Sequence, residues 1–113
     1  MHFDRFSAAD RIVVTIQSEA VGEPITDGAK IQALRVFVLS HSDGWSVPLA
    51  GPPIARLSAR FYQGDRFLGD FGAGEGFAAA QGCGYFQTRK LPSEDSADFA
   101  RLLGVGETEV RWK

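Results

Sequence analysis

The pattern that decides the fold lies in residues 55–71, which read ARLSARFYQGDRFLGDF. Apolar and polar residues alternate over 55–62 and again over 66–71, on either side of a short segment that contains Gly64. A period of two on both sides of a short glycine-containing turn predicts a β-hairpin. We expect one face of this hairpin to be buried in a core and its arginine-bearing face to meet solvent.

Further strands are predicted on both sides of the hairpin. Residues 11–17 carry β-branched side chains on both faces, residues 84–90 are interpreted as another strand with Tyr85 and Phe86 at its start, and the tail 108–113 is either an edge strand or a frayed end. The glycine- and alanine-rich stretch Gly72–Gly84 is interpreted as a long connection. Hairpins demand antiparallel neighbours, so the order β–α–β–β–β–α predicts an α+β fold. Its antiparallel sheet has four to five strands, with the helices packed on one face.

Two helices are predicted from their capping residues and spacing. The first begins at Thr26 or Asp27, both good N-caps, and runs to about His41. Its apolar face is wider than one stripe, which indicates deep burial or a second partner. The second helix is predicted to be capped by Ser93 and to end at Gly104 in a Schellman motif.

Composition and charge bound the class of protein. The chain has 113 residues, an ordinary size for a single domain spanning 1–113, and a formal net charge of −2. Its basic residues are too few and too scattered for nucleic-acid binding, although Arg89 and Lys90 are adjacent. The one cysteine, and the lack of a signal sequence or an apolar run long enough to cross a membrane, predict a cytoplasmic protein.

Candidate chemistry is sparse. The glycine-rich run lacks the third glycine and the βαβ context of a dinucleotide site, and no spaced metal-ligand set occurs, so neither a cofactor nor a metal is expected. An enzyme would have to use Cys83 with His41, or Asp70 as an acid or base. A pocket between the sheet and the Gly72–Gly84 loop is the other possibility. Its candidate ligand-binding residues are Trp45, Asp70, Glu75, Phe77, Cys83 and Tyr85.

An interface is suggested by large apolar side chains that the core pattern does not use. These candidate interface residues are Val36 and Leu39 on the first helix, with Trp45 and Trp112. Tryptophan is enriched at interface hot spots, which makes a homodimer plausible. The alternative for Trp45 is that it caps the core beside the first helix.

Several short patterns resemble those of small uncharacterised bacterial proteins, including proteins carried on integron gene cassettes. They are Ile25-Thr26-Asp27 with Lys30-Ile31, Asp43-Gly44-Trp45, the strand Leu57 to Tyr62 with Gly64, and Gly82-Cys83-Gly84. The resemblance implies a bacterial accessory protein but no activity and no site residues.

Three hypotheses of function follow from the sequence. The first is a binding or interaction module, homodimeric, whose partner is another protein or a small molecule. The second is a small-molecule-binding protein with the pocket described above. The third is an enzyme that uses Cys83, His41 and Asp70. Partners among nucleic acids and membranes are not expected.

Overall fold

The computed structural model describes residues 3–47, 54–81, 86–110 and 112, with only the backbone of 107 and 108. The strands are β1 (Arg11–Ile16), β2 (Glu19–Ala20), β3 (Leu57–Gln63), β4 (Arg66–Gly74), β5 (Phe77–Gln81) and β6 (Gln87–Lys90). The helices are the 3-10 helix η1 (Asp4–Ala8) and the α-helices α1 (Gly28–Leu39), α2 (Ser93–Leu102) and α3 (Glu107–Val110).

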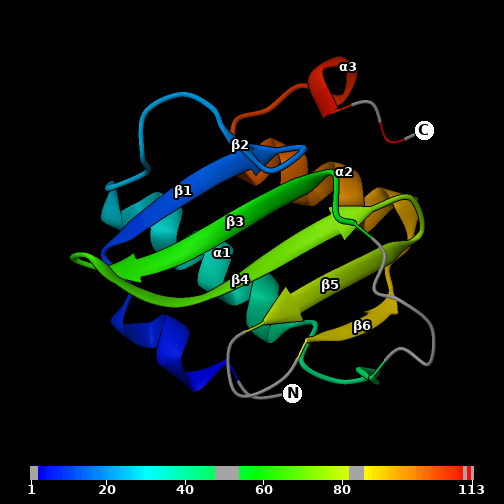
Figure 1. Ribbon diagram of the computed structural model, residues 1–113, viewed down its shortest axis with the longest axis horizontal. Coiled ribbons are helices and arrows are strands. Elements are labelled where there is room, and N and C mark those ends of the chain that lie inside the picture. Colours follow the sequence, from blue (N-terminus) through cyan, green and yellow to red (C-terminus); the bar gives the residue numbers. More distant parts are fainter. Residues whose placement is uncertain (1–2, 48–53, 82–85, 111, 113) are drawn as a thin grey trace.

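These strands form one antiparallel sheet in the order β2-β1-β3-β4-β5-β6. Figure 1 looks onto the sheet, with α1 and α2 behind it. The predicted α+β class, with helices on one face, is confirmed, and the sheet has six strands where four or five were predicted. We call the face turned away from α1 and α2 the open face.

The predicted hairpin is β3 and β4, joined by a two-residue turn with Gln63 opposite Arg66. Gly64 has a φ of 57°, a conformation that glycine adopts without strain, and its N–H donates to the Asp10 carboxylate at 3.0 Å. The alternate residues Leu57, Ala59 and Phe61 are completely buried. The alternation in the sequence therefore identifies the inward face correctly.

The interpretation of Gly72–Gly84 as a connection is wrong over most of its length. Gly72–Gly74 ends β4 and Phe77–Gln81 is β5, so that only Glu75 and Gly76 form a turn; residues 82–85 lie outside the described part of the chain. Alanine and glycine have low strand propensity, but tertiary packing overrides it here. The small side chains of Ala78 and Ala80 are fully buried in the core that the helices share with the sheet.

The first helix is confirmed with Asp27 as its N-cap, whose carboxylate accepts from the Ala29 N–H at 3.3 Å. It ends at Leu39, slightly before the predicted end at His41. Ile31, Leu34 and Val38 face the core, whereas Val36 and Leu39 remain 57% and 53% exposed. The broad apolar face predicted for this helix is therefore only partly buried by contacts among the described residues.

The second helix ends in the predicted Schellman motif. Gly104 has a φ of 74°, its N–H donates to Arg101 O, and the Val105 N–H donates to Ala100 O at 2.9 Å. The predicted cap was wrong: the N-cap position belongs to Pro92, and no side chain caps the helix. The tail forms the short helix α3 instead of a strand, with Val110 buried.

Aromatic rings fill the centre of the core between the sheet and the helices. Phe71 of β4 lies within 6.5 Å of five other rings, counted between centroids. They belong to Phe3, Phe37, His41, Trp45 and Phe99. This cluster joins β4 to η1, α1 and α2, so it ties the two layers together.

The turn between β1 and β2 stores conformational strain. Gln17 and Ser18 have φ values of 51° and 71°, although neither is glycine. We expect Ser18→Gly to raise the free energy of unfolding by about 1 kcal/mol, because glycine adopts positive φ freely. Urea denaturation measures the gain, and Ser18→Ala, which keeps the strain, is expected to show none.

Candidate binding site on the open face

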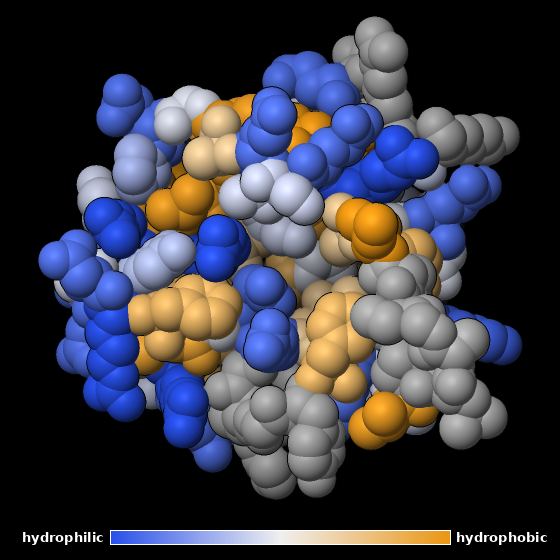
Figure 2. Space-filling model, viewed as in Figure 1, coloured by the Kyte–Doolittle hydropathy of each residue, from blue (hydrophilic) through white to orange (hydrophobic). Residues whose placement is uncertain are grey.

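The open face carries unusually small residues at its centre. The pairing of β4 with β5 places Gly72 opposite Ala79 and Gly74 opposite Phe77 on this face. Figure 2 shows this face hollowed near its middle, with polar residues and several separate apolar areas around the hollow. Small residues over two neighbouring strands leave room for another molecule to approach the sheet.

A cavity of about 260 Å³ lies over this region. Its lining residues come from the β1–β2 turn, from the segment before β3, from three strands and from the residue before β6. They are Ser18, Ile54, Ala55, Ser58, Asp70, Ala79 and Phe86. The described walls therefore combine four apolar residues with one carboxylate and two hydroxyl groups, a mixture that occurs in small-molecule sites.

Gly72 is required for this arrangement. A Cβ atom at Gly72 would lie 2.6 Å from Ser58 Oγ and 2.7 Å from Ala55 Cβ, closer than atoms in contact can come. The backbone of the next residue, Arg56, donates to Ala73 O at 2.9 Å. Ala55 is consequently held against the sheet, where it forms part of the cavity wall.

Among the described residues that line the cavity, Asp70 is the one with a titratable side chain. Burial raises the pKa of the Asp70 carboxyl above its ordinary value, although a backbone hydrogen bond from Gln81 and the charge of Arg60 both lower it. Arg60 lies directly opposite Asp70 in the sheet but forms no ion pair with it among the described residues. Its guanidinium group lies over the Phe67 ring instead, 5.2 Å from the centroid.

We expect the raised pKa of Asp70 to make stability fall as pH rises. The folded state binds more protons than the unfolded state between the ordinary and the raised pKa, so the cost of the charged carboxylate is absent below this window and complete above it. Asp70→Asn should therefore be more stable than the wild type at pH 7, with the difference shrinking toward pH 3. Thermal unfolding across this range tests the sign; a variant less stable at pH 7 would contradict it.

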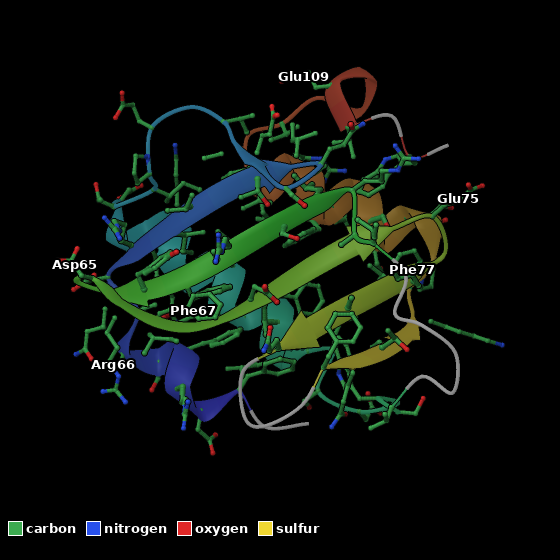
Figure 3. All side chains as sticks on the ribbon, in the orientation of Figure 1. Asp65, Arg66, Phe67, Glu75, Phe77 and Glu109 are labelled. Carbon is green, nitrogen blue, oxygen red and sulfur yellow. The ribbon has the colours of Figure 1, made fainter. Side chains whose placement is uncertain are left out.

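The other predicted ligand-binding residues do not converge on Asp70. Glu75 is exposed in the β4–β5 turn, and Phe77 lies at the same end of the sheet (Figure 3), its ring against Gly74. Trp45 lies on the helix side, where its indole N–H donates to His41 O. Trp45 was predicted either to lie in an interface or to cap the core beside the first helix, and the structure shows it packed against the core. Cys83 and Tyr85 lie outside the described residues.

The expected pocket beneath a Gly72–Gly84 loop has no counterpart among the described residues, because most of that stretch is strand. Nor are the proposed catalytic groups brought together. His41 is buried in the helix layer, hydrogen-bonded to Asp95 of α2, whereas Asp70 belongs to the open face on the other side of the sheet. The two cannot act on one substrate atom.

Sequence reasoning missed most of the cavity wall. The alternation in β3 does place Ser58 on the polar face, so that residue could have been found from the hairpin pattern. Ile54 and Phe86 approach Asp70 only through the tertiary path of the chain, and no local pattern marks them. Of the interface candidates, Val36 and Leu39 are exposed, and Trp112 is partly buried against the core.

Comparisons of the chain with protein-family models, with curated proteins and with solved structures found no match. The geometry of the open face is therefore the basis for the function proposed below. Within the described ranges, no helix has the length and hydropathy needed to cross a bilayer. The same residues contain no group of three or more potential metal ligands.

Proposed function

We propose that this protein is a small-molecule-binding module that takes an amine at Asp70 on the open face of its sheet. The observation that carries the proposal is the half-buried carboxylate in a cavity that Ile54 and Phe86 also line. A primary ammonium group would supply an opposite charge, and it would donate hydrogen bonds in addition to the one that the carboxyl accepts from the Gln81 backbone. Ile54 and Phe86 would contact an apolar part of the same ligand.

The free-energy cost of the Asp70 carboxylate also supports an amine ligand. A partly desolvated carboxylate without an ion pair costs stability at neutral pH, and an asparagine would avoid that cost. Groups that cost stability in a folded protein concentrate at functional sites. Bound amine would remove the cost, because an opposite charge within about 4–6 Å favours the ionised carboxyl.

The test uses benzylamine and benzyl alcohol, which match in size but differ in charge. We expect benzylamine at millimolar concentration to cause saturable NMR shifts at the amides of Asp70, Ala79 and Gln81. Benzyl alcohol should cause much smaller shifts. Asp70→Asn should abolish the preference for the amine, while the control Asp65→Asn, at an exposed acid in the β3–β4 turn, should retain it.

Two results would overturn the proposal. Equal binding of the amine and the alcohol would show that the carboxylate takes no part. Shifts that are the same in Asp65→Asn and Asp70→Asn, or no shifts from either compound, would show that this cavity is not a ligand site.

A second candidate function is self-association through α1. Val36 and Leu39 are large apolar side chains three positions apart, and each leaves more than half of its surface exposed. Residues at this spacing share one face of a helix and form a continuous apolar area. Sedimentation of the wild type should show a concentration-dependent dimer, and Val36→Glu with Leu39→Glu should give a monomer. A wild type that stays monomeric at high concentration would exclude this candidate.

The setting of the protein is also part of the proposal. The lone cysteine and the resemblance to cassette-type proteins favour a small accessory protein of the bacterial cytoplasm. Fractionation of cells expressing the tagged full chain tests the compartment, and recovery in a membrane or extracellular fraction would contradict it.

A further inference from the structure

A second cavity lies at the end of the sheet where β5 begins and β6 ends. Its volume is about 560 Å³, within the range of small-molecule sites. None of its described lining residues also lines the Asp70 cavity, and the charges it presents are of the opposite sign. The lining residues are Gly44, Ser46, Gly76, Phe77, Thr88, Arg89 and Lys90, which contribute two cations and no carboxylate.

The Arg89 guanidinium is held in place before any ligand arrives. Its Nε donates to Lys90 O at 2.9 Å, and its Nη1 donates to Asp43 O at 2.8 Å, with an Asp43 carboxylate oxygen 3.4 Å away. The Arg89 side chain is only 18% exposed, whereas that of Asp43 is 95% exposed and so largely hydrated. The remaining nitrogen, Nη2, has no hydrogen-bond partner among the described residues. A fixed cation with a free N–H group loses little entropy when it binds an anion.

Hydroxyl groups and open backbone surround this cation. Ser46 and Thr88 pair through their main chains, at 2.9 Å in both directions, and neither hydroxyl has a partner within the described part of the chain. Gly44 and Gly76 each have a φ of 78°, and no atom lies within 4 Å of where a Cβ of Gly76 would be. A ligand can therefore approach the main chain closely on this side.

The Phe77 ring gives the cavity a flat apolar wall. Phe77 and Lys90 are directly opposite in the β5–β6 pairing, so their side chains lie next to one another on the open face, whereas Arg89 is opposite the core residue Ala78 and its side chain leaves β6 on the helix side. Figure 3 shows Phe77 at this end of the sheet, with Glu75 in the adjacent turn. An aromatic face beside Lys90, with Arg89 at the same strand edge, suits a ligand that combines a negative charge with a flat ring.

We propose that this cavity binds an organic anion at the β6 edge of the sheet, where Lys90 reaches its phosphate or carboxylate group from the open face, Arg89 reaches it from beside the Gly44–Ser46 segment, and a flat ring packs against Phe77. The hydroxyl groups of Ser46 and Thr88 donate to the same anionic group. The site is separate from the amine site at Asp70 and does not depend on the function proposed for that site.

Phenyl phosphate is the probe. Inorganic phosphate has its anionic group without a ring, and benzyl alcohol has a ring without the charge. NMR titration of the full chain should show saturable shifts at the Gly44, Gly76 and Phe77 amides with phenyl phosphate. Each of the other two compounds should bind at least about tenfold more weakly, the usual effect of losing a charge-assisted hydrogen bond or a ring contact. Added sodium chloride should weaken binding, because the exposed part of the charge is screened.

Variants that remove one positive charge distinguish binding at this cavity from unspecific attraction to the charged surface. Arg89→Gln and Lys90→Gln should each weaken phenyl phosphate about tenfold or more. Arg66→Gln, at an exposed arginine near the far end of the sheet (Figure 3), should leave it unchanged. Lys90 is exposed, and no partner for its side chain occurs in the described ranges, so Lys90→Gln should fold normally even if loss of Arg89 disturbs the neighbouring loop.

The outcomes distinguish this proposal from the preceding one. Asp70→Asn should bind phenyl phosphate like the wild type, so either site can fail while the other stands. Equal weakening by Arg66→Gln and Lys90→Gln would show unspecific attraction to surface charge and overturn the proposal. Equal binding of phenyl phosphate and inorganic phosphate would remove the role of Phe77, and no saturable shift with any probe would overturn the site entirely.

Discussion

Replacement of Phe71 by alanine is expected to lower the free energy of unfolding by about 3–5 kcal/mol. Phe71 is completely buried, and its ring contacts Phe3, Phe37, Trp45 and Phe99. Those rings come from four different segments and cannot all collapse into one cavity, so the loss should lie near the upper end of this range. A domain of this size is stable by only about 5–15 kcal/mol, so the variant should have a much lower melting temperature.

Urea denaturation followed by tryptophan fluorescence measures this loss, because the Trp45 ring is one of the neighbours of Phe71. The control is Phe67→Ala in the same strand, where the ring is 39% exposed on the open face. That substitution should cost about 1 kcal/mol or less, the value of a cross-strand contact. Similar losses at the two positions would mean that the aromatic cluster does not hold the layers together.

Replacement of His41 by alanine should be the second most damaging change, with a loss of about 3 kcal/mol. His41 Nδ1 donates to Phe37 O at 2.7 Å, and Nε2 lies 3.2 Å from an Asp95 carboxylate oxygen. The ring is also packed against Phe37, with 4.4 Å between centroids. The side chain therefore joins the end of α1 to α2, and its removal leaves a cavity, breaks the contact with Asp95 and takes from Phe37 O one of its two side-chain donors, the other being Ser40 Oγ.

A double-mutant cycle with Asp95→Ala isolates the contribution of the pair. We expect a coupling energy of about 1–2 kcal/mol, since His41 is buried and Asp95 is partly exposed. Arg101 and Asp98 form an exposed pair within α2 and serve as the matched control, for which the coupling should be about 0.5 kcal/mol or less. Equal coupling in the two pairs would show that burial adds nothing to the His41–Asp95 contact.

The candidate sites illustrate how far sequence reasoning reaches. Asp70 was identified because a carboxylate stood on the polar face of a predicted strand, whereas Arg89 and Lys90 were noted only as adjacent basic residues and were not predicted to form a site. The sequence could not indicate which of these charged residues have apolar side chains beside them in a cavity. The walls of the Asp70 cavity come from Ser18, Ile54 and Phe86, which are distant from one another in sequence.

The sequence by itself determined the α+β class, the β3–β4 hairpin with its buried face, and the start of α1 and end of α2. These features depend on local rules: a period of two, a good N-cap at Asp27, and a glycine at position 104 that adopts positive φ. Tertiary structure alone decided that the alanines of β5 form a strand, because pairing with β4 and burial in the core outweigh a weak local preference. It also decided that His41 and Asp70 lie on opposite sides of the sheet, since the path of the chain between distant elements follows from packing and not from local pattern.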